Sequence, residues 1–243
     1  MVSVRDDRQE LVTTPDRLDW RAIGTALDRN GHALTPALLT PRECAELREL
    51  FDDDGAFRST IVMARHQFGE GVYRYFAHPL PPVVVRLRES LYPPLAAIAN
   101  TWAARLGAAR YPADLSGLTA RCRAAGQHRP TPLLLRYEPG GYNCLHQDLY
   151  GDVVFPLQVA IMLSRPGTDF TGGENVFVEQ RPRAQSRPMV ASPEQGQGLV
   201  FAVNERPVPS AARGWRRVIL RHGVSEVRSG LRYTLGVIFH DAT

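Results

Sequence analysis

Short runs of β-forming residues, separated by turn residues, fill the second half of the sequence, and this pattern constrains the fold more than any other feature. The turns include Gly140-Gly141, Gly172-Gly173 and Ser229-Gly230, which are typical of tight connections between strands. Strands are predicted over 132–138, 142–149, 153–164, 174–180, 197–203, 216–224 and 231–240. Because helical patterns precede them, we expect an α+β fold, with a double-stranded β-helix (jelly-roll) barrel in the C-terminal half and N-terminal supporting helices.

The first half of the sequence carries the helical patterns. Thr40 is predicted to cap a helix that begins at Pro41, with Glu43 completing a capping box. We expect residues 1–16 to form a flexible N-terminal tail and 17–243 a single domain, in which 17–130 supports a jelly-roll core over 131–243. The other predicted elements are helices over 18–30, 83–106 (broken near Pro93-Pro94) and 114–125, and strands over 33–39, 60–64 and 72–76.

The sequence contains no lysine, so its 29 basic residues are all arginine. This excludes Schiff-base and pyridoxal-phosphate chemistry and nucleotide binding through a P-loop or kinase lysine. The three cysteines, Cys44, Cys122 and Cys144, are odd in number and lack the spacing of a metal site. No apolar run is long enough to span a membrane. We therefore expect a soluble protein of a reducing compartment, the cytoplasm.

A His and an Asp two residues apart follow the Pro-Gly-Gly turn at 139–141. In an extended strand His146 and Asp148 point to the same side, because successive side chains alternate between the two faces. His222 lies 74 residues after Asp148, near the end of another predicted strand. Two imidazoles and one carboxylate form the facial triad that binds Fe(II) and leaves positions open for a cosubstrate and O₂. A surface strand pair or a hydrogen-bonded core histidine is the alternative interpretation.

An arginine opens the last predicted strand, ten residues after His222. This residue, Arg232, shares one face of the strand with Thr234, whereas the opposite face is apolar. A buried arginine needs an anion, since an unpaired buried charge is very costly. A guanidinium also matches a carboxylate through two parallel hydrogen bonds. We predict that Arg232, with Thr234 as a hydroxyl helper, binds a cosubstrate carboxylate; a structural salt bridge is the alternative.

Together, the His-x-Asp motif, the distant His and the following Arg resemble the Fe(II)/2-oxoglutarate-dependent dioxygenases. The resemblance covers roughly residues 131–241, including the run 136–142 before the metal motif and the glycine-rich turn at 170–174. With 63–66 and 73–76 upstream, the whole chain resembles a bacterial family within this superfamily that is labelled as acting on alkylated nucleic acid.

The resemblance implies particular cofactors and roles. Fe(II), 2-oxoglutarate and O₂ are expected, with ascorbate as an optional reductant, and 2-oxoglutarate is converted to succinate and CO₂ as a substrate C–H bond is hydroxylated. Hydroxylation of an N-methyl group ends in loss of formaldehyde. The resemblance assigns the metal to His146, Asp148 and His222. The distal carboxylate of 2-oxoglutarate is assigned to Arg232. Tyr137 and Tyr142 are further cosubstrate candidates, although a strand Tyr can equally be a core residue.

Two other groups of residues are candidates for substrate contact. Arg65, His66, Tyr73 and Tyr75 form a polar and aromatic cluster on the predicted early hairpin, where they can cover the mouth of the barrel or be ordinary surface residues. A set of arginines can line a phosphate-binding rim or belong to solvated loops: Arg181, Arg183, Arg187, Arg213, Arg216 and Arg217. AlkB-type repair enzymes carry a second arginine six residues after the first, where this chain has Ile238.

The sequence leaves the substrate open. An alkylated nucleic-acid base competes with a small molecule, an amino acid or a peptidyl residue. A flipped base requires stacking aromatic residues, which Tyr73, Tyr75 and Phe76 can supply. Two other classes of function are a non-catalytic jelly-roll domain that binds or senses a metal, and a zinc hydrolase that uses the same three ligands. No obligate protein partner is evident, and the oligomeric state is open.

Overall fold

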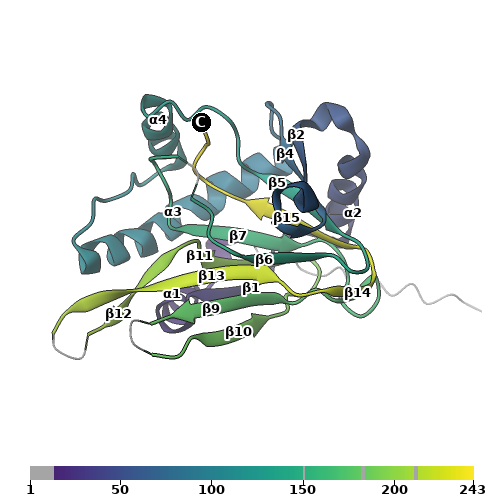
Figure 1. Cartoon of the computed structure of the whole chain (residues 1–243). Coiled ribbons are helices and arrows are strands. Elements are labelled where there is room, and N and C mark those ends of the chain that lie inside the picture. The colour runs from purple at the N-terminus through teal and green to yellow at the C-terminus, as the bar shows by residue number, and fades with distance from the viewer. Residues whose placement is uncertain (1–13, 150, 182–183, 211–212) are drawn as a thin grey trace, which may run out of the picture.

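The computed structural model of the protein describes residues 14–149, 151–181, 184–210 and 213–243. Two β-sheets lie one above the other, and helices cover the larger sheet on its outer side (Figure 1). The predicted α+β class is therefore confirmed. Of the tail predicted over 1–16, the part up to residue 13 lies outside the described residues, and the predicted limits of the single domain stay a prediction.

The helices begin and end where local side chains satisfy the free backbone groups. Asp19 accepts a hydrogen bond from the Ala22 N–H at the start of α1, and Gly31, with φ of 76°, ends the helix in the left-handed region. The capping box of Thr40 and Glu43 is present at the start of α2. Within the described ranges the α-helices are α1 (Trp20–Asn30), α2 (Pro41–Glu49), α3 (Pro82–Leu106) and α4 (Leu115–Ala124), and the 3₁₀-helices are η1 (Pro15–Arg17), η2 (Leu50–Asp52), η3 (Asp54–Ala56) and η4 (Met63–His66).

The strands of the two main sheets come from both halves of the chain. The larger sheet has the order β1-β11-β7-β15-β5-β4-β2, and the smaller sheet has the order β10-β9-β13-β6-β3, with β12 also pairing with β13. A third, small sheet pairs β14 with β8. The strands are β1 (His32–Ala37), β2 (Phe57–Val62), β3 (Gly69–Glu70), β4 (Val72–Phe76), β5 (Leu133–Tyr137), β6 (Tyr142–His146), β7 (Leu157–Met162), β8 (Phe170–Gly172), β9 (Asn175–Gln180), β10 (Arg187–Ala191), β11 (Gln197–Ala202), β12 (Glu205–Pro209), β13 (Trp215–Val224), β14 (Val227–Gly230) and β15 (Arg232–Val237).

Three local expectations differ from the structure. Helix α3 continues through Pro93 and Pro94, where a break was predicted. Buried side chains on both sides of the prolines, such as Leu91 and Leu95, fix this helix against the core, and burial outweighs the local cost of proline. The early hairpin pairs β2 with β4 as predicted, but its connection differs, because η4 occupies 63–66 and β3 pairs with β6 in the smaller sheet. Strands β1, β2 and β4 belong to the larger sheet, so residues before 131 are part of the sheet that lines the site.

A buried ion pair connects the smaller sheet to the end of α1. Arg206 is 2% exposed and Glu179 is fully buried, and the guanidinium donates to the Glu179 carboxylate. The same guanidinium also donates to the backbone carbonyls of Asp28 and Arg29, in the last turn of α1. Arg206 therefore fixes this helix end over the sheet that carries the candidate metal ligands. No helix in the described parts of the chain is both long and apolar enough to cross a membrane.

We expect Arg206→Ala to lower the free energy of unfolding by about 3–5 kcal/mol, because it leaves the buried Glu179 carboxylate with the partly exposed Arg181 as its remaining ion-pair partner. Chemical denaturation monitored by circular dichroism measures the change. Arg217→Ala is the matched control, since the Arg217–Glu205 pair is exposed and is worth about 1 kcal/mol or less. Equal effects of the two substitutions would contradict a structural role for the buried pair.

Candidate active site

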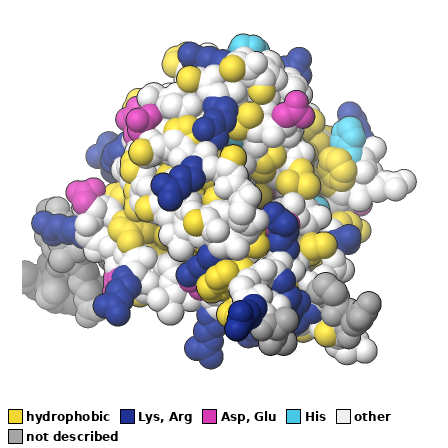
Figure 2. All heavy atoms as spheres, turned by 90° about the vertical axis from the view of Figure 1, so that its left-hand side faces the viewer, with side chains coloured by type: hydrophobic (Ala, Val, Ile, Leu, Met, Phe, Trp, Pro, Cys, Tyr) yellow, Lys and Arg dark blue, Asp and Glu magenta, His cyan; other side chains and the backbone are white. Residues whose placement is uncertain are grey.

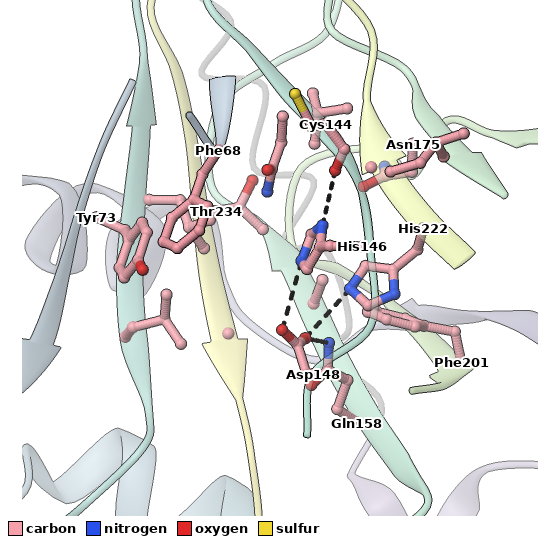
Figure 3. A pocket seen from close by; sticks show the side chains of 18 of the residues that line it. Phe68, Tyr73, Cys144, His146, Asp148, Gln158, Asn175, Phe201, His222 and Thr234 are labelled. Carbon is pink, nitrogen blue, oxygen red and sulfur yellow. Dashed lines mark hydrogen bonds and ion pairs between the residues drawn. The ribbon is translucent and has the colours of Figure 1, made fainter. Parts of the chain in front are cut away.

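Two histidines face each other across the smaller sheet. Strands β6 and β13 are antiparallel, and their register places His222 directly opposite His146. The two rings lie 4.3 Å apart, centroid to centroid, and Asp148 follows β6 by two residues. One ligand atom from each of His146, Asp148 and His222 lies within 4.8 Å of the others, and Figure 3 shows the three side chains converging. The structure thus brings together the three residues predicted as metal ligands.

Hydrogen bonds orient the first imidazole. The Nδ1 of His146 lies 2.8 Å from the Cys144 carbonyl oxygen. Because a carbonyl oxygen can only accept, Nδ1 carries the proton and donates a hydrogen bond to that oxygen. The Nε2 atom then keeps a free lone pair, and it lies 3.4 Å from the Asp148 carboxylate. The Nε2 of His222 lies 3.1 Å from the other carboxylate oxygen. Both imidazoles therefore direct Nε2 toward the same point, as the ligands of a single ion must do.

The carboxylate is fixed by its neighbours. Burial alone raises the pKa of Asp148, but His222 and His146 outweigh it and hold that pKa well below its usual range. Burial lowers the pKa of His222, and Asp148 opposes this only in part. Gln158, on β7, donates from its amide nitrogen to Asp148 over 2.6 Å, and both side chains are buried. The site therefore combines a charged carboxylate with a neutral imidazole, the protonation states of metal ligands.

A buried cation faces this cluster from the larger sheet. Arg232 is 1% exposed and donates to Thr234 over 2.8 Å and to Asn175 over 3.1 Å. Its Nε atom has no hydrogen-bond partner, and no carboxylate among the described residues forms an ion pair with it. Burial lowers the pKa of Arg232 to about 10, with Tyr137 and Glu174 acting in the opposite direction. The guanidinium is thus buried with spare hydrogen-bonding capacity and without an anion.

Tyr137 lies beside this arginine because β5 pairs with β15 and places the two residues opposite each other. The guanidinium carbon of Arg232 lies 5.4 Å from the Tyr137 ring centroid, over the ring. Burial raises the pKa of Tyr137 to about 12, so its phenol stays protonated. A neutral hydroxyl and a cation therefore lie together on the larger sheet, on the opposite side of the cavity from the three candidate ligands.

One cavity of about 380 Å³ contains both groups. Phe68 and Tyr73 stand across it from the histidines, as Figure 3 shows. Tyr73 and Tyr75 form an edge-to-face pair with ring centroids 5.5 Å apart. Apart from the candidate metal and cosubstrate residues, the lining is mainly aromatic and aliphatic, with a few amides. It includes Leu133, Leu135, Phe177, Phe201, Ile238, Gln67, Asn143, Gln147 and Asn175.

The predicted substrate residues divide into two groups. Tyr73 and Tyr75, on β4, line the cavity, whereas Arg65 and His66 are exposed on η4 and lie outside the lining. His66 nevertheless stacks on Phe68, with ring centroids 5.4 Å apart. Tyr142, a predicted cosubstrate residue, is 39% exposed and also lies outside the lining.

Of the six arginines considered as a phosphate rim, the five in the described residues do not line the cavity. Arg181 pairs with Glu179, and Arg217 pairs with Glu205. Arg183 lies outside the described residues. The remaining three are exposed: Arg187, Arg213 and Arg216.

Several residues that shape the site were not predicted from the sequence. Gln158 and Asn175 contact the Asp148 carboxylate and the Arg232 guanidinium from strands β7 and β9. Polar residues in otherwise apolar strand runs were the available signal, since a buried amide needs a partner. Phe68 and Gln67 were missed because the loop was interpreted as a simple turn. Gln67 has a φ of 59°, which is unusual for a residue other than glycine.

A comparison with protein families shows which family the chain belongs to. Residues 71–242 match the family Oxygenase-NA, described as oxygenases catalysing oxidative methylation of damaged DNA. The chain belongs to this family. Two uncharacterized proteins of Mycobacterium tuberculosis, one from each of two strains, are 54% identical to this oxygenase over 168 residues, which are 69% of this chain and 72% of theirs.

Solved structures share the fold of this oxygenase. An oxidoreductase of the 2OG-Fe(II) oxygenase family from Burkholderia pseudomallei gives a TM-score of 0.54 at 17% identity, covering 89% of this chain and 88% of the other. A prolyl-4-hydroxylase of Pseudomonas putida gives 0.51 at 15% identity, covering 92% and 100%. A prolyl hydroxylase of Trichoplax adhaerens, in complex with a peptide of hypoxia inducible factor, gives 0.52 at 14% identity, covering 91% and 89%. The jelly-roll prediction is confirmed.

The family and the site together give the class of reaction. This oxygenase is an oxidoreductase that depends on Fe(II), 2-oxoglutarate and O₂, as predicted. The non-catalytic and zinc-hydrolase alternatives are not supported by its family. The cosubstrate is 2-oxoglutarate.

We expect Gln158→Leu to weaken binding of Co(II) or Mn(II) about 10- to 100-fold, because the Asp148 carboxylate loses the amide that orients it. Isothermal titration calorimetry under anaerobic conditions measures the affinity. Gln195→Leu is the control, since the Gln195 amide donates to the Leu163 carbonyl and does not contact Asp148. Unchanged affinity in a folded Gln158→Leu protein would exclude this orienting role.

Proposed function

We propose that this oxygenase removes an alkyl group from a nucleic-acid base by oxidising the carbon attached to the base. His146, Asp148 and His222 hold Fe(II), and Arg232 with Thr234 and Tyr137 holds 2-oxoglutarate. The observation that carries the proposal is the convergence of two imidazoles and a carboxylate opposite a buried arginine without an anion, within one aromatic-lined cavity.

The donor set fits Fe(II). Two neutral imidazoles with one carboxylate are the ligands of non-heme iron oxygenases, and they leave positions for further ligands. The paired Nε2 atoms and the Asp148 carboxylate meet at the cavity wall, so an ion held there is accessible from the cavity. The Gln158 amide and the Cys144 carbonyl orient these ligands from behind, as outer contacts do at metal sites.

The opposite wall fits a dicarboxylate. The Arg232 guanidinium is buried, and a carboxylate there supplies the missing counter-charge through charge-assisted hydrogen bonds. The Thr234 hydroxyl and the side-chain amide oxygen of Asn175 already hold two guanidinium nitrogens in place. Tyr137 adds a neutral hydroxyl beside the cation.

The chemistry follows from this arrangement. Bound iron with 2-oxoglutarate supplies an oxidant from O₂, with succinate and CO₂ as products and one oxygen atom delivered to the substrate carbon. A methyl group on nitrogen becomes a hydroxymethyl group, which leaves as formaldehyde. Residues of the chain orient the reactants and exclude water: Leu133, Leu135 and Phe177 line the cavity with apolar surface.

Two features support a nucleic-acid base as substrate. The cavity lies within the roughly 300–1,000 Å³ of small-ligand pockets, and Tyr73, Tyr75 and Phe68 offer ring surfaces on which an extruded base can stack. Figure 2 shows arginine side chains spread over one face of the molecule, with few acidic side chains among them. Arg105, Arg110 and Trp215 line a shallow depression, and the Arg105 guanidinium carbon lies 4.2 Å from the Trp215 ring centroid. Arginine and aromatic surfaces of this kind suit a phosphate backbone and its bases.

We expect anaerobic addition of Fe(II) and 2-oxoglutarate to give a weak visible charge-transfer band in the wild-type protein and none in His146→Ala, because the triad then lacks one ligand. Absorption spectroscopy of matched, folded samples measures it. Absence of the band from folded wild-type protein would contradict the proposed ligand set.

We expect Arg232→Gln to raise the 2-oxoglutarate concentration that gives half of this band by about 10- to 100-fold, because hydrogen bonds to a charged group are worth about 1.5–3 kcal/mol each. The Fe(II) affinity measured without 2-oxoglutarate should stay unchanged, which separates loss of the cosubstrate from loss of the metal. Equal 2-oxoglutarate requirements in the two proteins would exclude Arg232 from this role.

We expect oligonucleotides with a methylated base to stimulate succinate and formaldehyde release in equal amounts, whereas unmethylated oligonucleotides should not. Chromatographic quantification of both products measures the coupling. Stimulation by free amino acids or prolyl peptides, without any by methylated oligonucleotides, would replace the nucleic-acid substrate with one of the alternatives left open by the sequence.

A further inference from the structure

The charges around the cavity are few and have defined partners. Among the described residues that line it, the charged side chains other than histidine are Asp148 and Arg232. In the proposed function Asp148 is a metal ligand and Arg232 binds the cosubstrate carboxylate. Both charges are then compensated, and the space left for the substrate is bounded by uncharged groups.

The substrate side of the cavity presents aromatic rings and amides. Tyr73 and Tyr75 form one wall, and Gln67, Asn143 and Gln147 bring amide groups into the lining. Burial raises the pKa of Tyr73 far above neutral pH, so its phenol is uncharged. Amides and phenols both donate and accept hydrogen bonds, which suits the carbonyl and N–H edges of a neutral base.

A positive charge already lies behind this wall. The guanidinium carbon of Arg58 lies 4.6 Å from the Tyr75 ring centroid, over the ring. The Arg58 Nε donates to the Pro130 carbonyl over 2.9 Å, which holds the guanidinium in place. Tyr75 lines the cavity, whereas Arg58 contacts the same ring and lies outside the lining. A second cation that enters the cavity beside Tyr75 would be repelled by the Arg58 guanidinium.

We propose that this site selects alkylated groups that are electrically neutral over those that carry a positive charge. The inference rests on the proposed function and names the class of lesion within it. Methylation at N3 of cytosine or N1 of adenine gives a cation at neutral pH, whereas N3-methylthymine is neutral. A cation moved from water into this cavity loses its hydration without gaining a free carboxylate among the described lining residues, and that loss is costly.

The test compares two lesions of nearly the same shape. Single-stranded oligonucleotides of one sequence carry N3-methylthymine or N3-methylcytosine at the same position. We expect kcat/KM for formaldehyde release at neutral pH to be at least about 10-fold higher for N3-methylthymine. The difference between the two kcat/KM values should shrink as the pH rises through the pKa of N3-methylcytosine, because the deprotonated, neutral form of this base then enters the cavity. Equal rates, or a preference for the cation, would overturn the inference while leaving the proposed function intact.

Turnover of neither oligonucleotide, in protein that gives the charge-transfer band, would overturn the proposed function and the inference with it. Fluorescence anisotropy under anaerobic conditions, with protein loaded with Mn(II) and 2-oxoglutarate, provides a second measurement that is independent of catalysis. The neutral lesion should bind more tightly than the cationic one, and equal affinities for the two would argue against selection by the cavity.

A carboxylate introduced into the cavity lining tests whether electrostatics cause the preference for neutral lesions. Gln67→Glu has the same shape as the native side chain and adds one negative charge to the lining, so we expect it to shift the ratio of the two kcat/KM values about 10-fold toward N3-methylcytosine. Arg58→Met, which removes the cation behind Tyr75, should shift the ratio in the same direction. Gln185→Glu is the matched control, because Gln185 is exposed and outside the lining, and it should leave the ratio unchanged. A ratio that stays constant in both cavity variants would overturn the electrostatic explanation.

Discussion

The register between β6 and β13 is the constraint on which the rest of the site depends. It places His222 opposite His146, so the two imidazoles meet on one face of the smaller sheet. A shift of one residue would turn one of them to the other face. The strands approach closely after His222, where a Cβ on Gly223 would lie 2.6 Å from the Asn143 carbonyl oxygen. Glycine at this position therefore permits the pairing that brings the candidate metal ligands together.

The two sheets contribute opposite charges to one cavity. The smaller sheet carries the Asp148 carboxylate, and the larger sheet carries the Arg232 guanidinium. Each charge is buried and is contacted by an amide side chain, that of Gln158 for the carboxylate and that of Asn175 for the guanidinium. A jelly roll suits this arrangement, since the inner faces of its sheets can approach a bound ion and its cosubstrate from two sides.

We propose that a different part of the chain decides the choice of substrate. The fold is shared with prolyl hydroxylases at 14–15% identity, so the barrel alone does not determine what is oxidised. The wall opposite the metal ligands comes from 67–75, a segment that runs from η4 through β3 to β4. Its rings, together with Ile238, give the cavity an apolar and largely uncharged character, whereas the face of the molecule seen in Figure 2 is rich in arginine. Recognition of a phosphate backbone and of a neutral base can therefore be carried by separate surfaces.

The sequence by itself was enough to predict the fold class, the His-x-Asp motif as candidate metal ligands, and Arg232 as an anion-binding residue. Strand periodicity is a local property, and a buried arginine in a strand requires an anion. Only the tertiary structure decided which other residues complete the site. Gln158 reaches the cavity from strand β7, and Phe68 reaches it from the loop after η4. No local sequence pattern encodes the contact of Gln158 with Asp148 or the place of Phe68 in the cavity wall. The same holds for α3, where packing against the core overrides the local preference of two prolines, and for Arg65, which the fold leaves at the surface outside the cavity. Side-chain parity along a strand is fixed by local geometry, but proximity between strands depends on how the whole chain packs.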